Sequence, residues 1–136
     1  MRTIDLPPAL KAVFAKVLAF QAEPGERFFA LCESTVSRTA EPRIVVRVRD
    51  NADRPLPGVS VTQEWPDGHE SLPSNPQGEV AFFLGPGSRF VPPRGGPHRI
   101  YVGRPESLTS DLVYSLGSPY GQAHSYVLTF AESVGD

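Results

Sequence analysis

The fold is decided by residues 43–65, which read RIVVRVRDNADRPLPGVSVTQEW. Apolar side chains alternate with arginine over most of the first seven residues, and the positions on the apolar face are Ile44, Val46 and Val48. This period of two predicts a half-buried β-strand with a basic outer face. After a turn at residues 50–58, the alternation resumes and places Val61 on the same face as Trp65. The stretch therefore predicts two consecutive strands.

The chain after residue 65 repeats this alternation between turn signals. We expect further strands over residues 69–72, 78–84, 97–103 and 125–130, with a long surface loop at residues 85–97. The 12 glycines and 15 prolines exclude a mostly helical bundle, because helix interiors disfavour both residue types. These features predict a mainly β fold, an antiparallel β-sandwich over residues 42–136.

Residues 1–41 follow a different pattern. Glycine is nearly absent, and apolar side chains recur at helical spacing between residues 10 and 18. With Asp5 as a cap, this spacing predicts a helix that ends near residues 23–26. The spacing of Phe28, Leu31 and Cys32 favours a second helix over residues 27–37, with a strand as the alternative. We therefore expect an N-terminal helix or helical hairpin, residues 1–41, before the sandwich domain.

The charge balance and the single cysteine exclude several classes of site. The 13 basic and 15 acidic residues give a formal net charge of -2. This balance argues against nucleic acid or an anionic membrane as the main partner, because both bind basic surfaces. Cys32 is the only cysteine, which excludes an intrachain disulfide and a cysteine-rich zinc site. We expect no signal peptide and no membrane-spanning segment. The cytoplasm is then the default location, with extracellular and particle-associated locations left open.

The strand half resembles a known group of domains. A strand, an acidic turn and Pro-Leu-Pro-Gly-Val at residues 55–59 are similar to the opening of transthyretin-like sandwiches, which include carboxypeptidase regulatory-like domains and collagen-adhesin B-type repeats. Gly78, before an aromatic strand, and residues 96–102 resemble later parts of that pattern. Residues 65–68, 110–117 and 124–130 are similar to motifs of bacterial Ig-like modules found beside polysaccharide-active enzymes. The resemblance covers residues 43–130 and implies a sandwich fold.

Aromatic residues near turns are the candidate ligand-binding residues. Trp65 precedes a turn and could stack on a sugar ring, or it could close the end of the core because it is in phase with Val61. Three tyrosines are further candidates for an exposed platform: Tyr101, Tyr114 and Tyr120.

The other polar residues give little indication of metal binding or catalysis. The three histidines, His69, His98 and His124, lie far apart in the sequence, so no two of them have the close spacing of metal ligands. Residues 50–53 lack the glycine and distal glutamate of a calcium loop, which favours an Asx-turn. Nucleophile-elbow and phosphate-loop motifs do not occur. We therefore predict no cofactor, no metal site and no enzyme activity, and a hydrolase that uses His124 and Asp111 is the least favoured alternative.

The leading hypothesis is a non-catalytic binding or assembly module that docks onto protein partners or onto copies of itself. The apolar face of the first predicted helix would supply the docking surface, and its partner-binding candidates are Leu10, Phe14, Val17 and Leu18. The alternative is a carbohydrate-binding accessory module that holds a polysaccharide through exposed aromatic residues. An uncovered helical face would favour assembly, and an exposed aromatic strip would favour carbohydrate binding.

Overall fold

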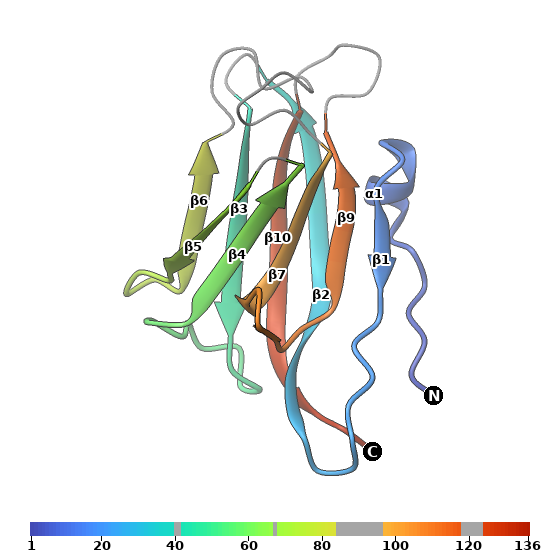
Figure 1. Cartoon of the computed structure of the whole chain (residues 1–136), viewed down its shortest axis with the longest axis vertical. Helices are drawn as coiled ribbons and strands as arrows, with labels where there is room; N and C mark the ends of the chain where they lie inside the picture. The colour runs from blue at the N-terminus through green and yellow to red at the C-terminus, as the bar shows by residue number, and fades with distance from the viewer. Residues whose placement is uncertain (40–41, 67, 84–96, 118–123) are drawn as a thin grey trace.

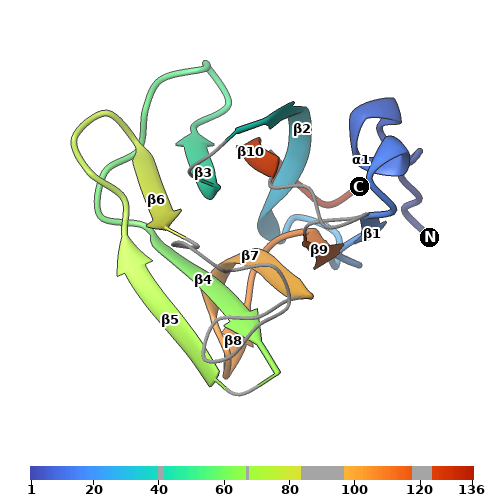
Figure 2. The same cartoon turned by 90° about the horizontal axis from the view of Figure 1, so that it is seen from above.

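The computed structural model of the chain describes residues 1–39, 42–66, 68–83, 97–117 and 124–136. In this part of the chain the strands form two sheets that lie face to face as two layers (Figure 1, Figure 2). The elements are α1 (Pro8–Ala12), β1 (Lys16–Leu18), β2 (Arg27–Arg38), β3 (Arg43–Arg49), β4 (Ser60–Trp65), β5 (Gly68–Pro73), β6 (Glu79–Phe83), β7 (His98–Arg104), β8 (Ser107–Leu108), β9 (Leu112–Leu116) and β10 (His124–Val134).

The strand order differs between the two layers. Sheet A has the order β1-β9-β7-β4-β5, with β8 paired to β7, and sheet B has the order β2-β10-β3-β6. Neighbouring strands are antiparallel except β3 and β10, which run parallel in the middle of sheet B. The prediction of a mainly β fold is confirmed, and the predicted antiparallel pairing holds for every described strand pair except this one.

The core lies between the two layers. Ile44, Val46 and Val48 of β3 are fully buried, as their alternation predicts. They belong to one apolar cluster with Ile100 of β7 and Phe130 of β10, so the cluster draws side chains from both sheets. Burial of apolar surface between layers is the main stabilising contribution in such a fold.

The strands predicted after residue 65 are confirmed with small changes in their bounds. The segments at residues 69–72, 78–84 and 97–103 correspond to β5, β6 and β7, and the last strand, β10, extends four residues further, to Val134. The loop predicted at residues 85–97 lies outside the described residues except for Pro97.

The predicted long first helix is wrong. Helix α1 has five residues and no side-chain cap, so Asp5 does not cap it. The chain leaves the helix at Phe14, whose φ of 63° lies in the left-handed region, and then forms β1 at the edge of sheet A. Such a short helix is marginal by itself, and the burial of Leu10 in the core holds it in place.

The predicted second helix, and with it the helical hairpin, is also wrong, because residues 27–38 form β2 and pair with β10 along their whole length. Thr129 of β10 pairs with Glu33, but the next residue pairs with Leu31, so Cys32 is an extra residue on β2. This bulge breaks the period of two and buries Phe28 and Leu31, which are three positions apart, as in a helix. The predicted boundary between residues 41 and 42 falls between β2 and β3, which both pair with β10.

The crossover from β3 to β4 contacts Gly78, the residue before β6. The N–H of Val48 donates to the Gly78 carbonyl at 2.8 Å, and the N–H of Leu56 donates to the Val48 carbonyl at 3.0 Å. The Ser74 hydroxyl donates to the Leu56 carbonyl at 2.6 Å and accepts from the N–H of Val59 at 2.9 Å. These bonds therefore join three segments at one point: the end of β3, the turn at residues 55–59 and Gly78 before β6.

Candidate functional site

A hollow of about 310 Å³ lies at the end of sheet A where β4 ends and β7 begins. We call it the rim hollow, and its lining residues are Glu64, Trp65, Pro66, Pro97 and Arg99. Because β4 and β7 are antiparallel neighbours, the last residues of one meet the first residues of the other. Their register places Glu64 directly opposite Arg99.

The charged groups of the rim hollow are held by a third side chain. The Oε1 atom of Glu64 lies 3.8 Å from Nη1 of Arg99. Tyr101, two positions beyond Arg99 on β7, donates its hydroxyl proton to Oε2 of Glu64. Burial of the phenol, together with the hydrogen bond and charge of Glu64, raises the pKa of Tyr101 well above its ordinary value. Tyr101 therefore stays protonated near neutral pH and fixes the position of the carboxylate.

Trp65 forms the apolar wall of the rim hollow. It is the last residue of β4, is half-buried, and pairs with Gly68 at the start of β5. A Cβ atom added to Gly68 would lie 3.3 Å from Cζ2 of Trp65, so the indole ring lies close to the glycine backbone. Trp65 thus combines both sequence-based interpretations, since part of the side chain is buried and part lines an open hollow.

The rim hollow brings together groups that suit a polyhydroxylated ligand. An indole face packs against the apolar C–H face of a sugar ring. A carboxylate accepts hydrogen bonds from hydroxyl groups, and a guanidinium donates hydrogen bonds in a fixed plane. Trp65, Glu64 and Arg99 supply these three groups around one hollow. The arrangement can bind and orient such a ligand.

The structure does not bring the predicted tyrosines together with Trp65. Tyr101 is only 3% exposed, so its predicted role in an exposed platform is wrong. It lies on β7, an inner strand of sheet A, where neighbouring strands flank an outward-facing side chain. Tyr114 is half-buried on β9, which β7 separates from β4, so about 10 Å lies between the strands of Tyr114 and Trp65. Tyr120 lies outside the described residues.

Glu64 and Arg99 are site residues that the sequence analysis missed. The alternation places each on the outer face of its strand, where a charged side chain is ordinary. They become a pair only through the register of β4 against β7, and alternation alone does not determine which strands are neighbours.

Polar side chains are also buried at this end of the two sheets. Gln63 and His98 are fully buried, and His124, at the start of β10, is 8% exposed. Within the described part of the chain, the side-chain amide of Gln63 has no hydrogen-bond partner, a state that costs about 1–3 kcal/mol. The described residues contain no group of three or more His, Cys, Asp or Glu side chains that could hold a metal ion.

The turn at residues 50–53 is an Asx-turn, as predicted. Oδ1 of Asp50 accepts from the N–H of Ala52 at 2.8 Å and from the N–H of Arg54 at 2.9 Å. Its Oδ2 accepts from Nε of Arg54 at 2.9 Å. The backbone amide of Arg54 is the main cause that lowers the pKa of the Asp50 carboxyl. Both carboxylate oxygens therefore serve to hold the turn.

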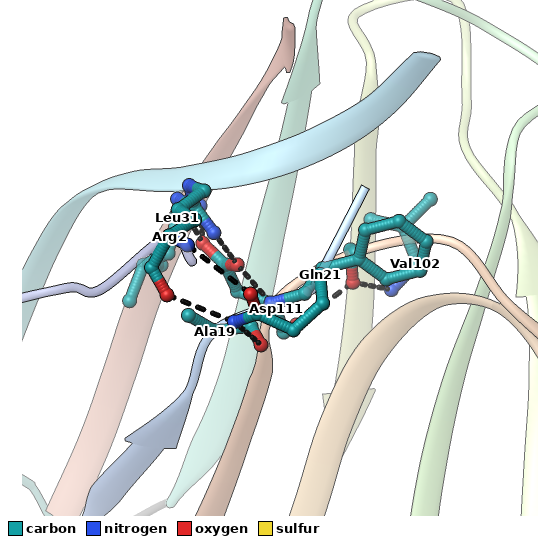
Figure 3. A network of polar contacts seen from close by, with 8 residues as sticks. Arg2, Ala19, Gln21, Leu31, Val102 and Asp111 are labelled. Carbon is teal, nitrogen blue, oxygen red and sulfur yellow. Dashed lines mark hydrogen bonds and ion pairs between the residues drawn. The ribbon is translucent and has the colours of Figure 1, made fainter. Parts of the chain in front are cut away.

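A buried carboxylate fastens the N-terminal segment to the sheets (Figure 3). Asp111, just before β9, is fully buried and receives both Nη groups of Arg2, with Nη2 at 2.9 Å from Oδ2. It also accepts from the N–H of Phe20 and the N–H of Leu31, each at 2.8 Å. The side-chain amide of Gln21 bonds both the N–H and the carbonyl of Arg2. We call Arg2, Phe20, Leu31 and Asp111 the Asp111 clamp.

The two residues of the hydrolase alternative do not meet. Asp111 bonds Leu31 of β2, whereas His124 pairs with Arg38 at the other end of that strand. Seven residues of extended strand separate these positions by about 23 Å. The hydroxyl of Ser110, beside Asp111, is held between the backbones of β7 and of Asp111 itself. His124 and Asp111 therefore cannot act together on one bond.

The predicted docking residues of the N-terminal segment divide into two pairs. Leu10 is fully buried in the core and Val17 is half-buried against it. Phe14 and Leu18 are 57% and 61% exposed. The apolar face that the sequence predicts is therefore partly covered by the chain's own sheets.

The sequence matches no protein-family model and no curated protein. Among the described residues, the one helix, α1, is much too short to cross a membrane.

Proposed function

We propose that the chain is a non-catalytic binding module with a transthyretin-like or Ig-like β-sandwich fold. The two facing sheets and the meeting of the residue 55–59 turn with Gly78 support this fold, because the resemblance depends on those segments. A binding role without catalysis agrees with the separation of His124 from Asp111 and with the bonds that already occupy the Asp111 carboxylate.

The ligand that the rim hollow suits best is a carbohydrate. The observation that carries this proposal is the half-buried Trp65, which lines one hollow together with Glu64 and Arg99. Carbohydrate binding ranks here above assembly because part of the predicted docking face, including Leu10, is buried in the core.

Trp65 provides a direct test of carbohydrate binding, since it is the only tryptophan of the sequence. Titration with soluble oligosaccharides of cellulose, xylan or chitin is expected to give a saturable shift in tryptophan emission with at least one of them. Replacement Trp65→Ala should weaken binding of that oligosaccharide about tenfold or more by calorimetry, because it removes the stacking surface.

Three further variants separate stacking from other effects. Arg99→Gln and Glu64→Gln should each weaken binding, whereas Tyr114→Ala, on the far side of β7, should leave it unchanged. If no oligosaccharide shifts the emission of Trp65, or if folded Trp65→Ala binds like the wild-type protein, carbohydrate binding at the rim hollow is rejected.

A second candidate function is self-association through the N-terminal segment. Phe14 and Leu18 are large, apolar and more than half exposed, and they lie in and beside β1 at the edge of sheet A. Phe14 also holds a left-handed backbone conformation that is strained for a bulky residue. An edge strand with exposed apolar side chains is suited to pair with the same strand of a second copy.

The double variant Phe14→Ser, Leu18→Ser tests this second candidate. We expect light scattering of the wild-type protein to show a dimer whose population rises with concentration, and the double variant to weaken association at least tenfold. The matched control is Phe83→Ser on β6, where an equally exposed phenylalanine lies in the other sheet. A wild-type protein that remains monomeric at all concentrations would exclude self-association.

A further inference from the structure

The outer face of sheet B carries side chains in rows across its four neighbouring strands. Strand register puts one row at the same end of the sheet as the start of β10: Ser37, Ser125, Arg43 and Phe83. The row behind it is mainly apolar: Thr35, Val127, Val45 and Ala81. The whole first row, with Val45 and Val127 of the second, lines a groove of about 370 Å³, which Arg38 at the end of β2 also lines. We call it the sheet B groove.

The sheet B groove is basic in a chain of net negative charge. Arg38 and Arg43 line it from β2 and β3, on either side of β10. Neither forms an ion pair with any residue that the structure describes, whereas Arg47, two rows beyond Arg43 on the same face, is bound to Glu79 at 3.1 Å. Within the described part of the chain, two guanidinium groups on one groove are thus without an acidic partner and can face an anion.

Hydroxyl groups lie between the two arginines. Ser125 Oγ accepts the backbone N–H of Arg43 at 3.1 Å, so its own proton remains available for donation. Ser37 pairs with Ser125 across the sheet and lines the same groove. The half-buried side chains of Val45 and Val127 form an apolar floor beside these donors.

We propose that the sheet B groove binds a phosphate monoester whose organic group is apolar. A phosphate monoester carries close to two negative charges at neutral pH, which matches two guanidinium groups. Its oxygens accept hydrogen bonds from the guanidinium groups and from the hydroxyls of Ser37 and Ser125. The organic group then packs on Val45 and Val127. This site lies on sheet B, away from the rim hollow of sheet A, and does not depend on the carbohydrate proposal.

Phenyl phosphate is the probe for this proposal, with phenyl sulfate, inorganic phosphate and benzyl alcohol as comparisons. In amide NMR spectra, phenyl phosphate is expected to shift the signals of Ser37, Val45, Ser125 and Val127 saturably. Inorganic phosphate and benzyl alcohol should each bind at least tenfold more weakly, because each lacks one half of the ligand. Phenyl sulfate, with a single charge, should bind several-fold more weakly than phenyl phosphate.

Arginine variants complete the test. Arg43→Gln retains the backbone bond to Ser125 and should weaken binding of phenyl phosphate about tenfold, as should Arg38→Gln. Arg104→Gln, an exposed arginine at the far end of β7, should leave the affinity unchanged. The proposal is overturned if the shifts lie outside the groove, if Arg43→Gln binds as tightly as the wild-type protein, or if inorganic phosphate binds as tightly as phenyl phosphate.

Discussion

Replacement of Asp111 by alanine is expected to lower the free energy of unfolding by about 3–5 kcal/mol, as measured by urea denaturation. The carboxylate is fully buried and accepts from Arg2, Phe20 and Leu31. Its removal leaves the partly buried guanidinium of Arg2 and two backbone N–H groups without their acceptor. The cost of removing these groups from water is then no longer offset by a hydrogen bond.

Two further variants test whether the loss of stability comes from the buried bonds of Asp111. Asp50→Ala is the matched control, because Asp50 also accepts two backbone N–H groups and an arginine side chain, but within one surface turn. Arg2→Met should cost less than Asp111→Ala, since the carboxylate keeps its bonds to Phe20 and Leu31. A loss for Asp111→Ala no larger than that for Asp50→Ala would contradict the clamp.

The Asp111 clamp also distinguishes the proposed self-association surface from the rim hollow. Arg2 and Phe20 are its contacts on either side of α1 and β1, so the clamp holds Phe14 and Leu18 in place from both ends. Its loss should therefore weaken self-association while leaving ligand binding at the rim hollow unchanged in the folded protein.

The sequence could predict the strands after residue 42 because one face of each strand is buried and the other is not. Val46 and Val48 alternate with arginine for this reason, and both are fully buried. The same reasoning failed for β2, where the extra residue Cys32 shifts the alternation and gives the spacing of Phe28 and Leu31 a helical appearance. A bulge depends on how the partner strand pairs, so the hydrophobic pattern of β2 alone does not predict it.

A residue of the rim hollow could be predicted from the sequence only where its own chemistry suggests a ligand contact. Trp65 stands out by its chemistry and by its place before a turn, and it lines the rim hollow. Glu64 and Arg99 are ordinary outer-face charges until strand register makes them neighbours. The sequence likewise does not indicate the structural role of Asp111, because its partner Arg2 is 109 positions away. Long-range pairing is a property of topology, which short-range periodicity does not contain.

Gly78→Ala is expected to destabilise the fold by about 2–5 kcal/mol, because two costs add at this position. The φ of Gly78 is 73°, a conformation that costs a residue with a Cβ atom about 1–2 kcal/mol. The added Cβ would also lie 2.7 Å from the carbonyl oxygen of Val48 and 3.0 Å from the backbone nitrogen of Leu56. These are backbone atoms of the crossover, so relief requires a shift of the crossover itself and overpacking costs about 1–3 kcal/mol more.

Gly58→Ala separates the two costs. Gly58 has nearly the same φ, 75°, but a Cβ atom there would meet no atom within 4 Å, so only the backbone cost of about 1–2 kcal/mol applies. Urea denaturation of both variants should therefore show the larger loss at Gly78. Equal losses would mean that the contact of Gly78 with Val48 and Leu56 contributes nothing. The support that this contact gives to a transthyretin-like crossover would then disappear, while the rim hollow on sheet A would be unaffected.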